Sequence, residues 1–533
     1  MWHLSGWPLT LLLLGLTLLL LVVFLREVNS YWRKLGVPYV EPTLLFGNAA
    51  GLFFMRESFA ALIENVYRRL EGCPVGGFYL MTRPYLLLRD PEVIKKVNLW
   101  DERYFHASSA QVRYCGFRPA SHEVLRDTAV HTEVRRRIAL VFGPERTRRV
   151  FCLLEGCVSC VLQHLQAACR GAPGPVEMRP HRVFAGYATD VIGRCAFGVE
   201  CGAIDDPSSQ FLRIGMEVSQ PSRWDPLLPC LRPLLLPLRY LLPRCTIISE
   251  GHQLFQRLFR ETVQHRERHG IQCDDVIQLL LQIKNGGLVS PCSSPALPDA
   301  TVDEALAYKL FGLFLVGFEM TSSVLSFCAF ELAADQAVQT RARLEVDAAL
   351  RRHSGRLTYD ALQSTPYLDA VITETLRLYP PMGVACRQVA APYEVPGAAA
   401  GAAAGAAAGA AARLRPGDCV CVSVAQLQRD AAHFPQPLAF RPERFLSGRQ
   451  QAPEHQSGGG GGGDGCYLAL GWGARPCVGK HFALVEMKAV LAALLSRFEL
   501  YPSLRSGRRP ANPEGAGRDL WVRVTPRIWY SDD

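Results

Sequence analysis

A short segment near the C-terminus carries the residues best suited to chemistry: Gly471, Gly473, Arg475, Cys477 and Gly479. Glycine lets a backbone approach a flat ligand closely. A helix is expected to begin a few residues after the cysteine, and its first N–H groups would stabilise a thiolate. The arginine can pair with an acidic group of the ligand. The segment therefore predicts a thiolate ligand for a flat, acidic cofactor.

Two upstream segments carry charged residues whose side chains can form ion pairs. Glu374 and Arg377 lie one helical turn apart, so their side chains can form an ion pair. Arg444, in the segment Pro442-Glu443-Arg444-Phe445, can join them as a third member. This spacing predicts a charged trio that stabilises the protein.

A long apolar run from Leu306 to Phe318 is followed directly by polar residues. A helix that is apolar on all sides is buried, so Glu319 and Thr321 are expected deep inside the protein. Met320 stands between them, and its thioether is only a weak acceptor that donates no proton.

In this order, the motifs resemble those of the cytochrome P-450 family, and the resemblance covers nearly the whole chain. The family's haem loop, Phe-Gly-x-Gly-x-Arg-x-Cys-x-Gly, is matched over 471–479, with Leu470 where phenylalanine is usual. Its Glu-x-x-Arg and Pro-Glu-Arg-Phe segments are matched at 374–377 and 442–445. The resemblance implies a mainly α-helical fold with small β-sheets. It also implies a haem cofactor whose iron is bound by Cys477, and a thiolate ligand favours O–O cleavage.

The resemblance also implies which residues bind the haem propionates. Arg475 belongs to the haem loop, and Arg135 matches the arginine of the family's Trp-x-x-x-Arg helix. His131 stands where tryptophan is usual; it can donate to a propionate, or it is an ordinary exposed histidine.

In the central helix, Met320 occupies the position of the family's oxygen-activating threonine, and Thr321 matches the threonine that follows it. Adjacent helical positions point about 100° apart, so Thr321 is not an automatic replacement. Glu319, with Thr321 or a water, is expected to manage protons. Met320 either fills the pocket or changes the chemistry.

The N-terminus predicts a membrane anchor. Leu4–Leu25 carries no charge, and about 20 apolar residues span a bilayer. The basic start and small-residue cleavage site of a secretory signal are missing. We expect a retained transmembrane anchor at 1–30 and a haem-thiolate catalytic domain at 31–533. The basic residues within 26–34 place that domain on the cytosolic side.

Composition excludes other classes of protein. The chain has 533 residues, 49% of them apolar, which excludes disorder. A net charge of +9 is too small to indicate nucleic-acid binding. The 18 cysteines are expected to be reduced. We expect strands at 78–89 with an interruption at Pro84, and exposed insertions at the Ala/Gly run 398–412 and the glycine run 458–463.

The anchor and the segments that follow it resemble microsomal detoxification members found in arthropods. This implies an endoplasmic reticulum location and electrons from NADPH through a flavoprotein reductase, with a cytochrome b-type donor as a second candidate. No Gly-x-Gly-x-x-Gly motif opens a βαβ unit, so no nicotinamide site is expected in this chain. Arginines within 135–137 and 146–149 are either solvated helix faces or a docking surface for an acidic donor.

The predicted function is a monooxygenase that inserts one atom of O₂ into a lipophilic substrate, a xenobiotic or an endogenous lipid or hormone. One alternative is a haem-thiolate isomerase or dehydratase acting on hydroperoxides. The other is a haem-binding protein without turnover. Met320, Leu470 and His131 keep both alternatives open.

Overall fold

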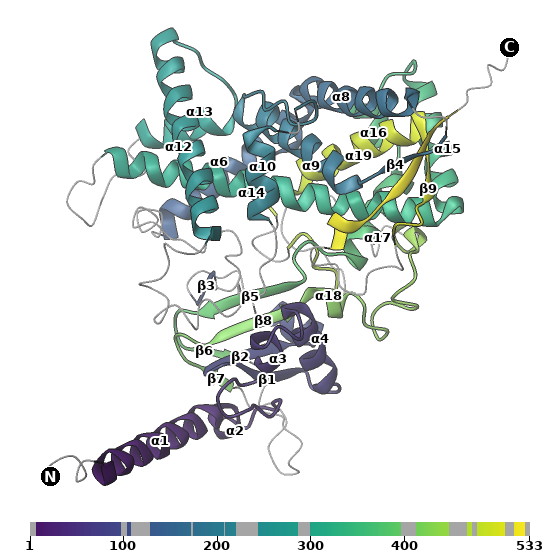
Figure 1. The fold of residues 1–533 in the computed structure, drawn as a ribbon. Coiled ribbons are helices and arrows are strands. Elements are labelled where there is room, and N and C mark those ends of the chain that lie inside the picture. Colours follow the sequence, from purple (N-terminus) through teal and green to yellow (C-terminus); the bar gives the residue numbers. More distant parts are fainter. Residues whose placement is uncertain are drawn as a thin grey trace.

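The fold is mainly α-helical with small β-sheets, as predicted (Figure 1). It was obtained as a computed structural model. The structure describes residues 7–97, 104–107, 128–171, 174–206, 208–219, 243–285, 299–395, 412–446, 466–471, 477–506 and 516–527. Apart from Ala412, which begins a strand, the Ala/Gly and glycine runs lie outside these residues.

Helices make up one end of the molecule and most of its mass (Figure 1). The α-helices are α1 Trp7–Asn29, α2 Tyr31–Lys34, α3 Ala50–Phe53, α4 Phe59–Arg69, α5 Pro91–Lys96, α6 Thr128–Val141, α7 Pro144–Arg149, α8 Phe151–Arg170, α9 Pro180–Val191, α10 Gln210–Val218, α12 Pro243–His269, α13 Val276–Asn285, α14 Asp299–Ala334, α15 Gln336–Arg352, α16 Tyr359–Gln363, α17 Pro366–Leu378, α18 Val424–Leu427 and α19 Lys480–Arg497. Three short helices have other geometries. The element η3 Ile192–Phe197 is a π-helix, and η5 Pro442–Phe445 and η6 Ala516–Asp519 are 3₁₀-helices.

The described strands form three sheets, with the orders β1-β2-β8-β5-β3, β4-β10-β9 and β6-β7. The strands are β1 Val75–Leu80, β2 Arg83–Leu88, β3 Phe105–Ala107, β4 Val176–Met178, β5 Val384–Val389, β6 Tyr393–Val395, β7 Ala412–Leu414, β8 Cys419–Ser423, β9 Phe498–Pro502 and β10 Val522–Pro526. In the largest sheet only β2 and β8 run parallel.

The expected interruption at Pro84 is wrong. Pro84 lies inside β2 and pairs with Tyr79 of β1. The chain turns at Met81 instead, which has a positive φ of 55°. A proline is tolerated in a strand where no partner needs its missing N–H, and the tight turn sets the end of β1.

Helix α14 runs through the helical part and forms its spine. It packs along α9 and against α12, α17 and α19. A Cβ at Gly317 would overlap the side chain of Ile192, so glycine permits the close approach of η3. Buried serines are satisfied along the helix: Ser322 Oγ donates to the Phe318 carbonyl at 2.6 Å. The prediction of a buried central helix is confirmed.

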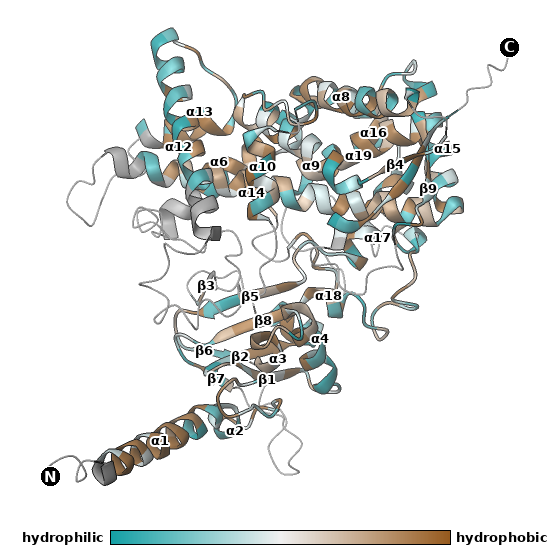
Figure 2. Cartoon of the chain, viewed as in Figure 1, coloured by the Kyte–Doolittle hydropathy of each residue, from teal (hydrophilic) through white to brown (hydrophobic). Residues whose placement is uncertain are grey.

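Three described helices are long and apolar enough to cross a membrane, and they differ in their surroundings. Phe151–Arg170 and Leu306–Ala334 pack into the helical core. Thr10–Asn29 instead projects from the sheet end (Figure 2), and most of its leucines are exposed, for example Leu14 at 67%. This apolar N-terminal helix is consistent with a membrane anchor.

Candidate haem-thiolate site

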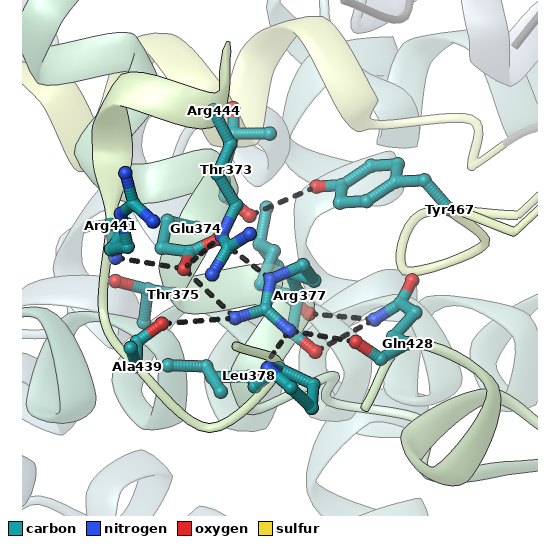
Figure 3. Close-up of polar contacts among 12 residues, drawn as sticks. Thr373, Glu374, Thr375, Arg377, Leu378, Gln428, Ala439, Arg441, Arg444 and Tyr467 are labelled. Carbon is teal, nitrogen blue, oxygen red and sulfur yellow. Dashed lines mark hydrogen bonds and ion pairs between the residues drawn. The ribbon is translucent and has the colours of Figure 1, made fainter. Parts of the chain in front are cut away.

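The predicted charged trio is present and buried (Figure 3). Glu374 on α17 accepts hydrogen bonds from Arg377 Nε at 2.7 Å and Nη2 at 2.8 Å. The Glu374 carboxylate also accepts from Arg444 Nε at 3.2 Å and from the backbone N–H of Arg441 at 2.9 Å. Both Glu374 and Arg377 are fully shielded from solvent. A buried carboxylate with this many donors is strongly bound in place.

Arg377 uses its remaining donors to hold the chain between α18 and η5. Its Nη1 donates to the carbonyls of Gln428 at 2.7 Å and Pro437 at 2.8 Å. Its Nη2 also donates to the carbonyl of Ala439 at 3.3 Å. One guanidinium therefore connects α17 to a segment about 50 to 60 residues further along the chain.

Gln428 extends this network to the loop that precedes the cysteine (Figure 3). Its side-chain Nε2 donates to the Arg377 carbonyl at 2.9 Å, and its Oε1 accepts from the Leu468 N–H at 2.8 Å. Beside it, Tyr467 Oη donates to the Thr373 carbonyl at 3.4 Å. Sequence reasoning missed Gln428, because a single glutamine outside any motif gives no spacing signal.

Cys477 lies directly before α19, as predicted, and backbone bonds set its position. Its N–H donates to the Leu470 carbonyl at 2.8 Å, and its carbonyl accepts from the Lys480 N–H at 3.2 Å. Gly471, which begins the matched motif, has φ of +84°. This left-handed conformation is costly for residues with a Cβ, which accounts for the first glycine of the motif.

Cys477 is exposed, and its described neighbours Gly471, Val478 and Gly479 are half-buried. Leu468 and Phe482, on either side in the chain, are 4% and 5% exposed. Surrounding protein atoms raise the pKa of the Cys477 thiol by desolvation, whereas the backbone N–H of Gly479 and the positive charge of Arg135 lower this pKa.

This donor fits a haem iron. A soft sulfur donor opens onto accessible space at the start of a helix, with an arginine charge near enough to act on Cys477. Because the thiol keeps its proton when the protein surroundings act alone, binding of a metal ion is what would drive deprotonation.

The residues expected at the propionates are described to different extents. Arg135 lies on α6, is half-buried and acts electrostatically on Cys477. His131 lies one helical turn before Arg135 on α6, and only its backbone is described. Arg475 lies outside the described residues.

Glu319 on α14 forms an ion pair that sequence reasoning missed. Its Oε2 accepts from Arg518 Nη2 of η6 at 2.9 Å, and its Oε1 accepts from Ser323 Oγ at 3.3 Å. Both partners of the ion pair are 13% exposed. Burial raises the pKa of the Glu319 carboxyl, while Arg518, Ser219 and Ser323 lower this pKa.

Thr321 contacts a different element. It is 3% exposed, and its side chain lowers the pKa of the Glu486 carboxyl on α19. Burial raises the pKa of Glu486 well above its usual value, which favours the protonated form of this carboxyl. The structure therefore gives Glu319 and Thr321 separate partners, with half-buried Met320 between them in the chain. A signal for Glu486 existed: it is an acid within an apolar helix.

Comparison with known proteins identifies the family of the chain. The family model described as Cytochrome P450 matches residues 38–519. Probable cytochrome P450 6a13 of Drosophila melanogaster is 32% identical over 92% of this chain and 92% of its own length. Cytochrome P450 6a2 of the same fly is 30% identical with the same two coverages. Cytochrome P450 9e2 of Blattella germanica is 29% identical over 89% of this chain and 88% of its own length. The chain belongs to the cytochrome P450 family, whose cofactor is haem bound through a cysteine thiolate.

Proposed function

We propose that this chain is an NADPH- and O₂-dependent haem-thiolate monooxygenase that inserts one oxygen atom into lipophilic substrates. The observation that carries the proposal is the exposed Cys477, three residues before α19 and close enough to Arg135 for that positive charge to lower the pKa of its thiol. The loop before Cys477 is held to the buried Glu374–Arg377 pair through Gln428. A rigid mount of this kind keeps a cofactor ligand in one place.

When bound, the haem supplies the oxygen chemistry. The chain's own residues hold it: Cys477 ligates the iron, and Arg135 and Arg475 pair with the propionates. His131, one turn from Arg135 on α6, is proposed as a further propionate donor. The proposed ligand and propionate residues come from helix α6 and from the segment before α19.

Proton delivery is assigned to Glu319, because its carboxyl is largely buried and its pKa is raised by burial. Such a carboxyl can take up and release a proton near neutral pH more readily than an exposed one. Thr321 is less suited to this role, since its side chain acts on Glu486 of α19 rather than on Glu319. Met320 provides no hydroxyl at the position between them.

The electron donor is proposed to be a flavoprotein reductase, with a cytochrome b-type donor as the second candidate. The basic segment of α7 supports docking only in part. Arg146 is 6% exposed and donates to the Cys195 carbonyl at 3.0 Å, so it stabilises the interior. Arg148 and Arg149 are exposed and remain candidates for contact with an acidic partner, although each also faces an aspartate of this chain.

The deciding experiment compares two oxygen sources for the purified full-length protein. One reaction contains reductase, NADPH and O₂ with a small lipophilic library, and the other contains only a lipid hydroperoxide. Product that depends on NADPH supports the monooxygenase. Rapid conversion of the hydroperoxide without NADPH supports the isomerase or dehydratase, and no product in either reaction supports a binding protein.

The anchor is proposed to be residues 1–30, with the catalytic domain 31–533 on the cytosolic face of the endoplasmic reticulum. Its exposed leucines support membrane insertion. Full-length protein should stay in membranes through alkaline and high-salt washing. Deleting the residues before Ser30 should weaken attachment and leave haem binding intact. Protease protection of the large domain inside vesicles would contradict the orientation.

A further inference from the structure

A buried histidine without partners lies on the α9 side of α14. His181, the second residue of α9, is 1% exposed. Among the described residues, neither its Nδ1 nor its Nε2 has a hydrogen-bond partner. Burial, then the positive charges of Arg518 and Arg179, lower the pKa of His181 to about 3. The imidazole is therefore neutral, with one donor and one acceptor unused.

The arginine that acts on His181 is the one that binds Glu319. Arg518 donates hydrogen bonds from Nη2 to the Glu319 carboxylate at 2.9 Å and from Nη1 to the Met216 carbonyl at 3.1 Å. Its buried Nε has no partner in the described part of the chain. The element that carries it, η6, packs against both α9 and α14. Three unpaired polar atoms thus belong to two residues close enough to interact electrostatically.

Other charges around His181 are already paired. Arg179, directly before α9, lies 3.9 Å from the carboxylate of Asp519 on η6. That carboxylate is 90% exposed, so solvent screens it. On α14, Glu319 is paired with Arg518. None of these groups gives a hydrogen bond to the imidazole.

Buried polar atoms are rarely left unpaired in folded proteins, and buried water usually completes them with about three hydrogen bonds. Here the chemistry is complementary, because Arg518 Nε can only donate and a neutral imidazole can both donate and accept. A water between them would satisfy both groups and would hold the guanidinium in the orientation that reaches Glu319.

We propose that His181 is a positioning residue that, through buried water, orients Arg518 and thereby controls the ionisation of Glu319. The inference rests on the proposed function in one respect only, which is the role of Glu319 in delivering protons during turnover. Arg518 opposes the effect of burial on Glu319. Loosening Arg518 leaves burial dominant, so the Glu319 carboxyl should keep its proton to a higher pH.

The test is infrared titration of the haem-loaded, resting full-length protein, which needs no turnover. The carbonyl stretch of protonated Glu319 is assigned as the band that disappears in Glu319→Gln. In His181→Phe the titration of this band should move upward by about one pH unit, a tenfold change in proton affinity. His181→Gln keeps a donor and an acceptor and should restore the wild-type titration. His164→Phe, on an exposed face of α8, is the control.

An unchanged Glu319 titration in His181→Phe, together with a raised thermal midpoint, would overturn the proposal, because it would mean that the imidazole is dry and merely unpaired. If His181→Phe does not fold, a crystal structure of the wild-type protein decides. Water that joins His181 to Arg518 Nε supports the proposal, and its absence refutes it. Failure of NADPH-dependent turnover would refute the proposed function and leave this titration unaffected.

Discussion

Replacing Glu374 by glutamine should cost more stability than any conservative substitution at the surface. The carboxylate has zero exposure and accepts from two nitrogens of Arg377, from Arg444 and from a backbone N–H. Glutamine keeps the shape. It removes the charge and turns an NH₂ donor toward guanidinium donors, which leaves Arg377 as a buried, unpaired cation.

Removing one partner of a buried ion pair costs about 3–5 kcal/mol. At about 1.4 kcal/mol for each tenfold change, the folding equilibrium falls about 100- to 4,000-fold. With a urea dependence of about 3 kcal/mol per molar, the midpoint should fall by about 1 M or more. The loss should appear at the haem, because Arg377 and Gln428 connect this pair to the loop before Cys477.

The assay is a urea titration of the full-length protein in detergent, followed by haem absorbance. Asp360→Asn is the matched control, since Asp360 also accepts two bonds from one arginine, Arg148, at 2.6 and 2.7 Å. That pair is 60% and 59% exposed, so its loss should change stability by about 0.5 kcal/mol or less. If Glu374→Gln keeps the wild-type midpoint, the network does not hold the haem loop.

Three more outcomes are expected. Cys477→Ser should lose the red-shifted absorption of the reduced carbon monoxide form, whereas Cys152→Ser, at another exposed thiol, should keep it. Met320→Thr should raise the product formed per NADPH consumed at unchanged haem content, and unchanged coupling would show that Met320 only lines the pocket. Glu486 has its pKa raised by burial, so wild-type stability should fall as pH rises above about 4.5. The free energy of unfolding of Glu486→Gln, measured by urea titration, should therefore rise relative to that of wild type between pH 5 and pH 8. A difference between the two proteins that stays constant over this range would mean that Glu486 is charged in the folded state.

Short-range spacing explains which parts of the site could be predicted. Glu374 and Arg377 are three residues apart on one helix, so their pairing follows from helix geometry. The helix after Cys477 and the burial of α14 also followed from local pattern. These features depend on sequence within about one or two turns.

The missed partners are all distant in the chain. Arg518 lies 199 residues from Glu319, and Gln428 lies 40 residues from Leu468. No periodicity connects such positions, because the packing of whole elements decides which side chains meet. The proximity of Thr321 to Glu486 is of the same kind. Helix geometry indicated that Thr321 and Met320 point in different directions, but only the packing of α14 against α19 brings Thr321 near Glu486.

The long-range contacts of the helical core also set an order of events during synthesis. Arg377 leaves the ribosome well before the carbonyls of Pro437 and Ala439 that it binds. Gln339 of α15 can form its two hydrogen bonds with Leu500 only after Leu500 has been synthesised. Asp347 can likewise pair only after Arg527 has been synthesised. A nascent chain therefore keeps the largely buried Asp347 without its arginine partner until Arg527 emerges. Translation that stops short of Arg527 would release a protein with an open core, which is the kind of species that chaperones and proteases remove.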